Sequence, residues 1–318
     1  MNLRKPHIII NPFSGGGKTR KRLNYILSLL KRYCSKGYSL CVTQGPLEAT
    51  FSARKTIVEG CELVISIGGD GTIHETVNGF FSNGRLINPA CQLGIINCGT
   101  GHGFAQSLKL PSTIEKQFEV IFNGTGHLVD IGKIIFSDKN GETLESFFVN
   151  ECQAGIGGEV VKKIMLHHKK LGGLIAFGVV TLSTAFSYPN QLVTIEIDGT
   201  YEVTKRFIGI TVGNGKYTAG GMNLTPSAEL NDGLLDILLI HEQSLLHRIW
   251  NFSGIYSGRH IVSQQFSYFQ GKGISLNSSE KILVEADGEL LGFLPCRIEV
   301  MPSALSVKLN CSERSDNT

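Results

Sequence analysis

The sequence predicts an α/β fold followed by a β-sandwich. Residues 1–130 are expected to form an open, mostly parallel α/β sheet domain, because a short apolar strand, a glycine-rich turn and a helix recur three times there. From about Ile131 this alternation stops, and short strands separated by turn residues predict a β-sandwich domain over residues 131–310. The tail, residues 311–318, is expected to be flexible.

Apolar spacing places the elements of the first half. Strands are expected at His7–Asn11, Ser39–Thr43, Leu63–Ile67 and Leu93–Cys98, and helices at 19–34, 47–59 and 73–81, with a short helix before Pro111. Because the carboxyl ends of parallel strands meet at one edge of a sheet, a ligand is expected beyond them.

Turn residues separate the strands of the second half. Asp198-Gly199, between two alternating runs, predicts a hairpin. Strands are expected at Gln191–Asp198, Tyr201–Val212, Leu234–Ile240, Gly273–Leu276, Lys281–Ala286, Arg297–Val300 and Leu305–Leu309, and helices near 159–188 and 243–257. The domain boundary is expected at 130–133.

Charge and cysteine usage narrow the class of protein. The formal net charge of +3 excludes a nucleic-acid-binding polycation, but no Asp or Glu precedes Glu48, and such a basic segment suits phosphates or an anionic membrane surface. The 8 cysteines lack a C-x-x-C pair, which indicates reduced thiols in a cytoplasmic protein. The longest apolar run, Leu171–Leu182, is shorter than the ~20 residues of a membrane span, and the N-terminus leads into a strand rather than a signal sequence.

The stretch Ile65-Ser-Ile-Gly-Gly-Asp-Gly-Thr72 is the strongest indication of a phosphate site. Gly68, Gly69 and Gly71 allow a tight turn and a close approach to an anion at the start of a helix. We expect Thr72 to cap that helix and Glu75 to complete a capping box. Asp70 beside phosphates indicates Mg²⁺ or the orientation of a transferred group.

Two further turns are expected to converge with this one on a single ligand site beyond the carboxyl ends of the strands. They are Asn11-Pro-Phe-Ser-Gly-Gly-Gly-Lys18 and Gly99-Thr100, and Thr43 follows the second strand. Gly17-Lys18-Thr19 resembles the end of a P-loop, but Pro12 occupies the position of its first glycine. In the second half, Asn231–Asp236 and Glu285–Glu289 are acidic turns, for which a hairpin role and a functional role both stay open.

Taken together, these motifs resemble the diacylglycerol kinase catalytic-domain family, which includes bacterial soluble lipid kinases and the sphingosine and ceramide kinases. The match covers nearly the whole chain and rests on Asn11-Pro-Phe-Ser-Gly15, Gly68-Gly-Asp-Gly-Thr-Ile-His-Glu75, Val77-Asn-Gly79, Gly99-Thr100, Val129-Asp-Ile-Gly132, Val212-Gly-Asn-Gly215, Gly220-Gly221, Pro226–Asp236 and Asp287-Gly-Glu289. The resemblance implies ATP-dependent, Mg²⁺-assisted phosphorylation of a membrane-lipid hydroxyl, with ATP in a cleft between the α/β domain and the β-sandwich.

The resemblance also implies roles for single residues. The nucleotide site would comprise Asn11, Ser14, Gly15, Thr43, Gly68, Gly69, Asp70, Gly71, Thr72, Glu75, Gly99 and Thr100. Asp287 would be the general base, with Glu289 as the neighbour that could replace it. Asp232, with the backbone carbonyls of Glu229 and Leu234, would hold a structural Mg²⁺, and Asp70 and Asp130 would reach the catalytic Mg²⁺ through water.

One segment departs from the pattern of bacterial members. Where they usually continue Gly-Asn-Asp-Phe-Ala after Gly99-Thr100, this chain has Gly101-His-Gly-Phe-Ala105, so a carboxylate is missing. A non-catalytic nucleotide or lipid sensor is the alternative that applies if this change abolishes metal support. A NAD kinase-like enzyme with a soluble substrate is a separate alternative, against which the motifs of the second half speak. Lys162, Lys163, Lys169 and Lys170, which precede the apolar run 171–182, suggest transient docking on a membrane, or else the basic end of a packed helix. A homodimer is a further expectation.

Overall fold

The computed structural model describes residues 5–99, 101–167, 174–218 and 220–310, with the side chains of 167, 174–177 and 249–253 left aside. These residues form two compact units, one of residues 5–99, 108–129 and 304–310 and the other of residues 101–107, 130–167, 174–218 and 220–303. The predicted site residue Thr100, the predicted docking residues Lys169 and Lys170, and the tail 311–318 lie outside the described residues.

The first unit is built on a parallel sheet, as the sequence predicts. β1 (His7–Ile10), β2 (Ser39–Val42), β3 (Leu63–Gly68) and β6 (Gln92–Asn97) lie in the order β2-β1-β3-β6. The end of β16 (Glu289–Leu309) pairs in parallel with β6, where Ser306 lies opposite Gln92. A separate short hairpin joins β4 (Phe81–Ser82) to β5 (Arg85–Leu86).

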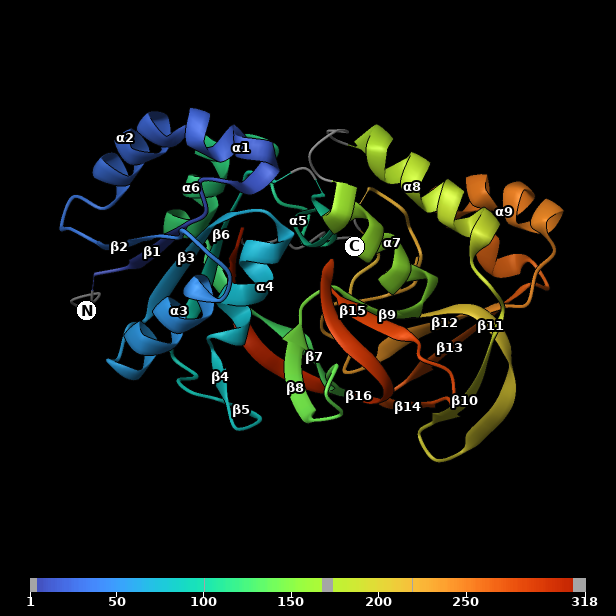
Figure 1. Cartoon of the computed structure of the whole chain (residues 1–318). Helices are drawn as coiled ribbons and strands as arrows, with labels where there is room; N and C mark the ends of the chain where they lie inside the picture. Colours follow the sequence, from blue (N-terminus) through green and yellow to red (C-terminus); the bar gives the residue numbers. More distant parts are fainter. Residues whose placement is uncertain (1–4, 100, 168–173, 219, 311–318) are drawn as a thin grey trace, which may run out of the picture. The chain divides into compact units, whose positions relative to one another are not determined.

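Helices cover both faces of this sheet (Figure 1). The helices are α1 (Ser14–Lys21), α2 (Leu23–Tyr33), α3 (Glu48–Val58), α4 (Asp70–Asn78) and α6 (Ile114–Asn123). On one face, apolar side chains of α2 and α6 such as Ile26 and Phe118 pack on Ile8 and Ile65. On the other face, α3 and α4 pack together, and Thr76 of α4 hydrogen-bonds a serine of β3 at 3.2 Å.

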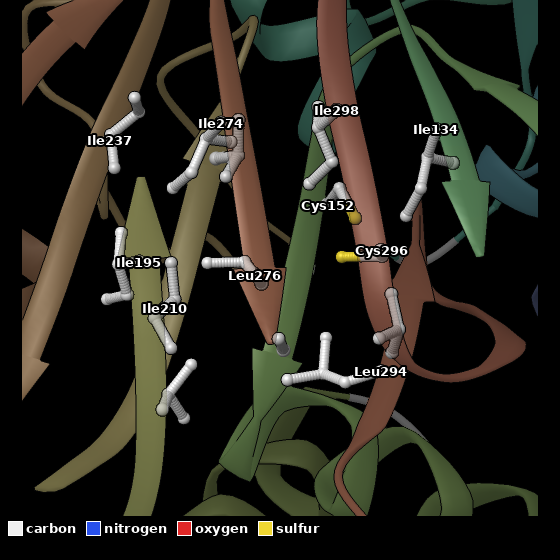
Figure 2. Packing of buried hydrophobic residues seen from close by; sticks show 14 of the residues in the cluster. Ile134, Cys152, Ile195, Ile210, Ile237, Ile274, Leu276, Leu294, Cys296 and Ile298 are labelled. Atoms are coloured by element: carbon white, nitrogen blue, oxygen red, sulfur yellow. The ribbon is translucent and has the colours of Figure 1, made fainter. Parts of the chain in front are cut away.

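The second unit is a sandwich of antiparallel strands whose sheets are joined at their edges. Its strands are β7 (Thr125–Ser137), β8 (Thr143–Phe148), β9 (Glu151–Gly155), β10 (Gln191–Ile197), β11 (Tyr201–Gly213), β12 (Leu235–His241), β13 (Phe266–Gly271), β14 (Gly273–Asn277), β15 (Leu283–Ala286) and β16. Consecutive pairings β10-β11-β9-β15-β16-β14-β10 close a ring. Buried side chains such as Ile195, Ile210, Leu276 and Cys296 fill its interior (Figure 2).

The helices of the second unit are α5 (Gly103–Ser107), α7 (Ile156–His167), α8 (Leu174–Ser187), α9 (Leu245–Ser257) and the 3₁₀ helix η1 (Arg259–Val262). Of these helices, α7 and η1 contact the strands, and α8 packs on α7 and α9 (Figure 1). Arg248 joins α8 to α9, because its guanidinium donates to the backbone oxygens of Ala185 and Tyr188, both at 2.7 Å. Among the helices that the structure describes, none has the length and apolar character needed to cross a bilayer.

The hairpin predicted at Asp198-Gly199 is confirmed. β10 and β11 pair in antiparallel fashion, and both turn residues have a left-handed backbone, with φ of 51° and 66°. The Asp198 carboxylate also accepts the N–H groups of Lys272 and Gly273 at 2.8 to 3.0 Å. An Asp is therefore used here for its side chain as well as for the turn.

One expectation about continuity is not met. The strands expected at Arg297–Val300 and Leu305–Leu309 are parts of one strand, β16, and residues 304–310 belong to the first unit rather than to a domain 131–310. The two units divide between residues 129 and 130, directly before the boundary expected at 130–133, and β7 runs through this point.

Candidate active site

Three glycine-containing turns of the first unit meet beyond the carboxyl ends of β1, β3 and β6. A Cβ atom added to Gly99 would lie 2.6 Å from Gly69 Cα, and one added to Gly15 would lie 2.7 Å from the backbone oxygen of Cys98. Side chains at these points would therefore push one backbone segment away from another. The turns after β1 and β3 lie where the strand order reverses, which is where open α/β sheets bind ligands.

Polar side chains tie the first turn to the second. Asn11 Nδ2 donates to Thr72 Oγ1 at 3.1 Å, and the Asn11 backbone N–H donates to the oxygen of Ile67 at 3.0 Å. The Ser14 hydroxyl donates to the Asn11 backbone oxygen at 3.0 Å and lies 2.5 Å from Thr19 Oγ1. The structure thus brings together Asn11, Ser14 and Thr72, as the sequence predicts.

The backbone of the first turn has the geometry of an anion site. Gly15, Gly16 and Gly17 have φ of 62°, 66° and 85°. At Gly16 and Gly17 a Cβ atom would meet nothing within 4 Å, so glycine serves the backbone conformation there. Successive peptide groups in such turns form concave anion sites, and the exposed Lys18 and Arg20 follow directly. This arrangement suits phosphate groups.

The capping box predicted at Thr72 and Glu75 is wrong. α4 begins at Asp70 with a glycine as its N-cap residue and without a side-chain cap, so Thr72 lies inside the first turn. The Glu75 carboxylate instead accepts the N–H groups of Leu47 at 3.0 Å and Ala49 at 3.2 Å. Glu75 therefore holds the beginning of the neighbouring helix α3.

The other predicted nucleotide residues lie in or beside the second turn. Gly68 ends β3, and a Cβ atom there would lie 2.3 Å from Thr72 Oγ1. Asp70 and Gly71 are the first two residues of α4, where a carboxylate interacts favourably with the helix dipole. Thr43 is buried directly after β2, and its backbone N–H donates to the last residue of β1 at 2.9 Å.

In the second unit, Asp287 lies in a two-residue hairpin turn between β15 and β16. Ala286 pairs with Glu289, and the turn residues Asp287 and Gly288 have φ of 51° and 84°. The Asp287 side chain is buried, and its carboxylate accepts the backbone N–H groups of residues 149–151 at 2.9 to 3.2 Å. The hairpin interpretation of this acidic turn is confirmed, and the turn holds its carboxylate in one orientation.

Glu285 is a second buried carboxyl group beside this turn. Its side chain accepts the Gly288 backbone N–H at 2.9 Å. Burial, with Asp287 as a further cause, raises the pKa of Glu285 from 4.5 to about 8. Glu285 is therefore a protonated acid over much of the neutral range.

The raised pKa predicts a loss of stability with rising pH. The folded protein binds the Glu285 proton more tightly than the unfolded chain, so its contribution is complete below pH 4.5 and is lost as the pH rises through about 8. Glu285→Gln keeps an acceptor for the Gly288 N–H and cannot ionise. We expect its advantage in the free energy of unfolding over the wild type to grow between pH 5 and pH 8.5, by at most about 4 kcal/mol.

Urea unfolding at the two pH values measures this difference, with Glu145→Gln on the surface as control. An equal difference between the variant and the wild type at both pH values would show that Glu285 does not titrate in this range.

Asp130 has a set of partners that its sequence context does not reveal. It is fully buried, and its two carboxylate oxygens accept the backbone N–H groups of Gly233 at 2.7 Å and Ser303 at 2.6 Å. Its own N–H donates to the Leu230 oxygen at 2.6 Å. Asp130 thus fixes the turn that contains the predicted metal residues; its predicted contact with a catalytic metal ion stays a prediction.

The predicted metal residues lie in this turn. Asp232 and Glu229 are exposed, and Asp232 Oδ1 accepts the backbone N–H of Leu234 at 3.0 Å. Farther along, Asp236 accepts a hydrogen bond from the Tyr268 hydroxyl at 2.7 Å, and burial raises the pKa of Asp236. The side chain of Tyr268 also receives the Ser227 backbone N–H at 3.3 Å, so the segment is anchored at both ends.

Sequence reasoning does not identify Asn150 as a residue of this site. Asn150 follows the apolar run 147–149 at the end of β8 and resembles an ordinary strand end. In the structure it contributes one of the N–H groups that hold Asp287, and its backbone oxygen accepts the N–H groups of Asn214 and Gly215, both at 2.8 Å. No local motif predicts these contacts, because the partners lie far away along the chain.

Comparisons with known proteins agree with both units. The diacylglycerol kinase catalytic domain matches residues 5–134, and the YegS C-terminal NAD kinase beta sandwich-like domain matches residues 151–309. The chain is 30% identical to the diacylglycerol kinase of Bacillus subtilis over 303 residues, which cover 92% of each protein.

Solved structures show the same fold. A diacylglycerol kinase of Bacillus anthracis superposes with a TM-score of 0.70 at 22% identity, covering 98% of both chains. A yeast NADH kinase complexed with NADH reaches a TM-score of 0.56 at 13% identity, with 99% of this chain and 85% of that chain covered. The predicted fold class, an α/β domain and a β-sandwich, is confirmed. The chain belongs to the diacylglycerol kinase family and is a kinase that phosphorylates an alcohol group.

Proposed function

We propose that this protein is an ATP-dependent lipid kinase that transfers the γ-phosphate of ATP to the hydroxyl group of a membrane lipid such as diacylglycerol or a sphingoid base. The convergence of the three glycine turns in the first unit carries the proposal, since it combines close backbone packing with a left-handed run suited to phosphates. Membership of the diacylglycerol kinase family supports the choice of ATP and of a lipid.

The proposed reaction needs few groups. The lipid oxygen attacks the γ-phosphorus, the bond from that phosphorus to the bridging oxygen of ADP breaks, and Asp287 accepts the hydroxyl proton. The turns around Asn11, Gly69 and Gly99 would hold the phosphates, with Asp70 at the start of α4. Positioning supplies most of the rate enhancement in phosphoryl transfer, which supports a site made of rigid turns.

The residues present fit the predicted Mg²⁺ sites in their chemistry. Asp232 and the carbonyls of Glu229 and Leu234 are hard oxygen ligands in one exposed turn, which Asp130 holds in place. A cluster of three or more His, Cys, Asp or Glu side chains suited to a metal is absent from the described part of the chain. Bound Mg²⁺ would thus rest largely on backbone oxygens and water, and at the nucleotide it would neutralise phosphate charge.

Transfer of labelled γ-phosphate to a panel of acceptors tests the function. The panel contains diacylglycerol, sphingosine, ceramide and phosphatidylglycerol in mixed micelles, with NAD as a soluble acceptor. A labelled lipid supports the proposal and identifies the substrate. Labelled NADP alone would establish the NAD kinase-like alternative, whereas ATP binding without any labelled product would favour a sensor.

We further propose that α7 and the segment after it dock transiently on anionic membranes. Lys162, in the middle of α7, is exposed, and so are Met165 and Leu166 near the end of the helix, with 53% and 72% of their surfaces accessible. Basic side chains beside exposed apolar ones suit the interface of a bilayer, where each Lys contributes roughly 1 kcal/mol.

We expect a fourfold variant to bind phosphatidylglycerol vesicles at least tenfold more weakly in a sedimentation assay. The variant replaces Lys162, Lys163, Lys169 and Lys170 with Glu. The control reverses four lysines elsewhere, namely Lys31, Lys55, Lys139 and Lys205, which are all exposed. Equal binding of both variants would exclude the docking role.

A further inference from the structure

The side chain of Asn150 is buried between segments that are distant in the sequence. Its amide nitrogen donates to the backbone oxygen of Tyr217, and its amide oxygen accepts from the Ser107 hydroxyl at 3.1 Å. Ser107 is the last residue of α5, and its single hydroxyl proton is shared between Asn150 Oδ1 and the Gly103 oxygen, both at 3.1 Å. Both ends of the amide are therefore engaged, one by the 214–218 turn and one by α5.

The backbone of the same residue holds Asp287. The N–H groups of residues 149–151 converge on the Asp287 carboxylate, and the Asn150 N–H donates at 2.9 Å. Asn214 holds the segment 149–151 in place, because its side-chain nitrogen donates to the backbone oxygens of Val149 and Asp130, at 2.8 and 2.9 Å. The side chain of Asn150 is thus attached to the peptide groups that set the direction of the Asp287 carboxylate.

Two glycines leave room for this amide. A Cβ atom at Gly215 would lie 2.3 Å from Asn150 Oδ1 and 2.7 Å from the Ser107 hydroxyl oxygen. A Cβ atom at Gly103 would lie 2.9 Å from the Tyr217 oxygen and 3.1 Å from Asn150 Nδ2. An Asp at position 103 would collide with this arrangement. Gly103, which stands where the pattern of bacterial members has a carboxylate, therefore leaves the space that the Asn150 side chain needs.

We propose that Asn150 is the positioning residue for Asp287 and couples the orientation of its carboxylate to the 101–107 segment. The inference rests on the proposed role of Asp287 as proton acceptor. Asn150 acts through the backbone and does not itself take part in proton transfer. Its loss should therefore slow turnover without weakening ATP binding, which depends on turns of the first unit.

Kinetics of Asn150→Ala test the proposal in the full chain with ATP and the lipid that the panel identifies. We expect kcat to fall at least tenfold, while KM for ATP stays within twofold. The control is Asn190→Ala, which removes an amide with the same number of side-chain hydrogen bonds in the same unit, to Glu242 and Arg248. A kcat of Asn150→Ala within twofold of the wild type would overturn the proposal.

A double-mutant cycle separates positioning from a general loss of packing. Gly215→Ala displaces the Asn150 amide, so it should lower kcat like Asn150→Ala, and the double variant should lose no more than either single variant. If the fold-losses in kcat of the two single variants multiply in the double variant, the two substitutions do not act through Asn150 in common, and the proposal is contradicted. If Asn150→Ala fails to fold, Ser107→Ala, which removes one hydrogen bond to the amide, is expected to lower kcat two- to fivefold, and an unchanged kcat would then overturn the proposal.

Hydrogen exchange gives a readout that does not need activity. The amides of residues 149–151 should exchange at least tenfold faster in Asn150→Ala than in the wild type, as they should in Asp287→Ala. Unchanged exchange rates would contradict the positioning role even if the wild type phosphorylates no lipid. Absence of turnover in the wild type, with the exchange result as expected, would instead reject the proposed function.

Discussion

Asp287→Asn is expected to reduce lipid phosphorylation at least about 100-fold while ATP still binds, because general-base catalysis contributes on the order of 10²–10⁴ to such reactions. The substitution preserves the size of the side chain and removes the negative oxygen that would accept the proton. Asp287 lies in the second unit, apart in the chain from the glycine turns of the first, so the affinity for ATP should stay within twofold.

Glu289→Gln is the matched control, since Glu289 pairs across the same hairpin turn. We expect it to keep kcat within threefold of the wild type. Retained turnover in Asp287→Asn, together with loss in Glu289→Gln, would transfer the role of base to Glu289. Loss of folding is checked by thermal unfolding, because an amide at position 287 would present N–H groups to one of the three backbone donors.

Gly99→Ala is expected to weaken ATP binding by roughly one to two orders of magnitude. The added Cβ atom would lie 2.6 Å from Gly69 Cα, where only movement of the backbone can relieve the clash. Overpacking of this kind costs about 1–3 kcal/mol, and each 1.4 kcal/mol of lost binding free energy is about tenfold in affinity. Titration calorimetry with ATP measures the effect.

Gly45→Ala is the control for this substitution. Its Cβ atom would meet only the end of the Glu48 side chain, at 3.7 Å, so its ATP affinity should match that of the wild type. Undiminished ATP binding by Gly99→Ala would show that the convergence of the second and third turns does not form the nucleotide site.

Local patterns predict the elements of this chain better than their ends and contacts. The parallel strands of the first unit follow from short apolar runs, but α6 is missed although Thr113 caps it and accepts the Lys116 N–H at 3.4 Å. The capping box fails because the start of α4 depends on the extended backbone at Gly69, which the letters Gly-Asp-Gly-Thr do not specify.

Long-range partners explain most of the remaining differences. Glu75 caps a helix whose first residues lie 26 to 28 positions earlier, and Asn150 contacts segments on both sides in the sequence. The addition of the end of β16 to the first sheet joins Ser306 to Gln92, 214 positions apart. Pairings of this kind are fixed by tertiary packing, so single-sequence patterns predict the hairpin at Asp287 but not what its carboxylate binds.

Single-turnover transfer of labelled γ-phosphate from ATP to diacylglycerol in mixed micelles tests the central claim most directly, with the wild type, Gly99→Ala and Asp287→Asn measured side by side. We predict labelled lipid from the wild type, recovery of much of this product by Gly99→Ala only at raised ATP, and almost none from Asp287→Asn at any ATP concentration. A wild-type protein that binds ATP and labels neither diacylglycerol nor another lipid of the panel would contradict the account.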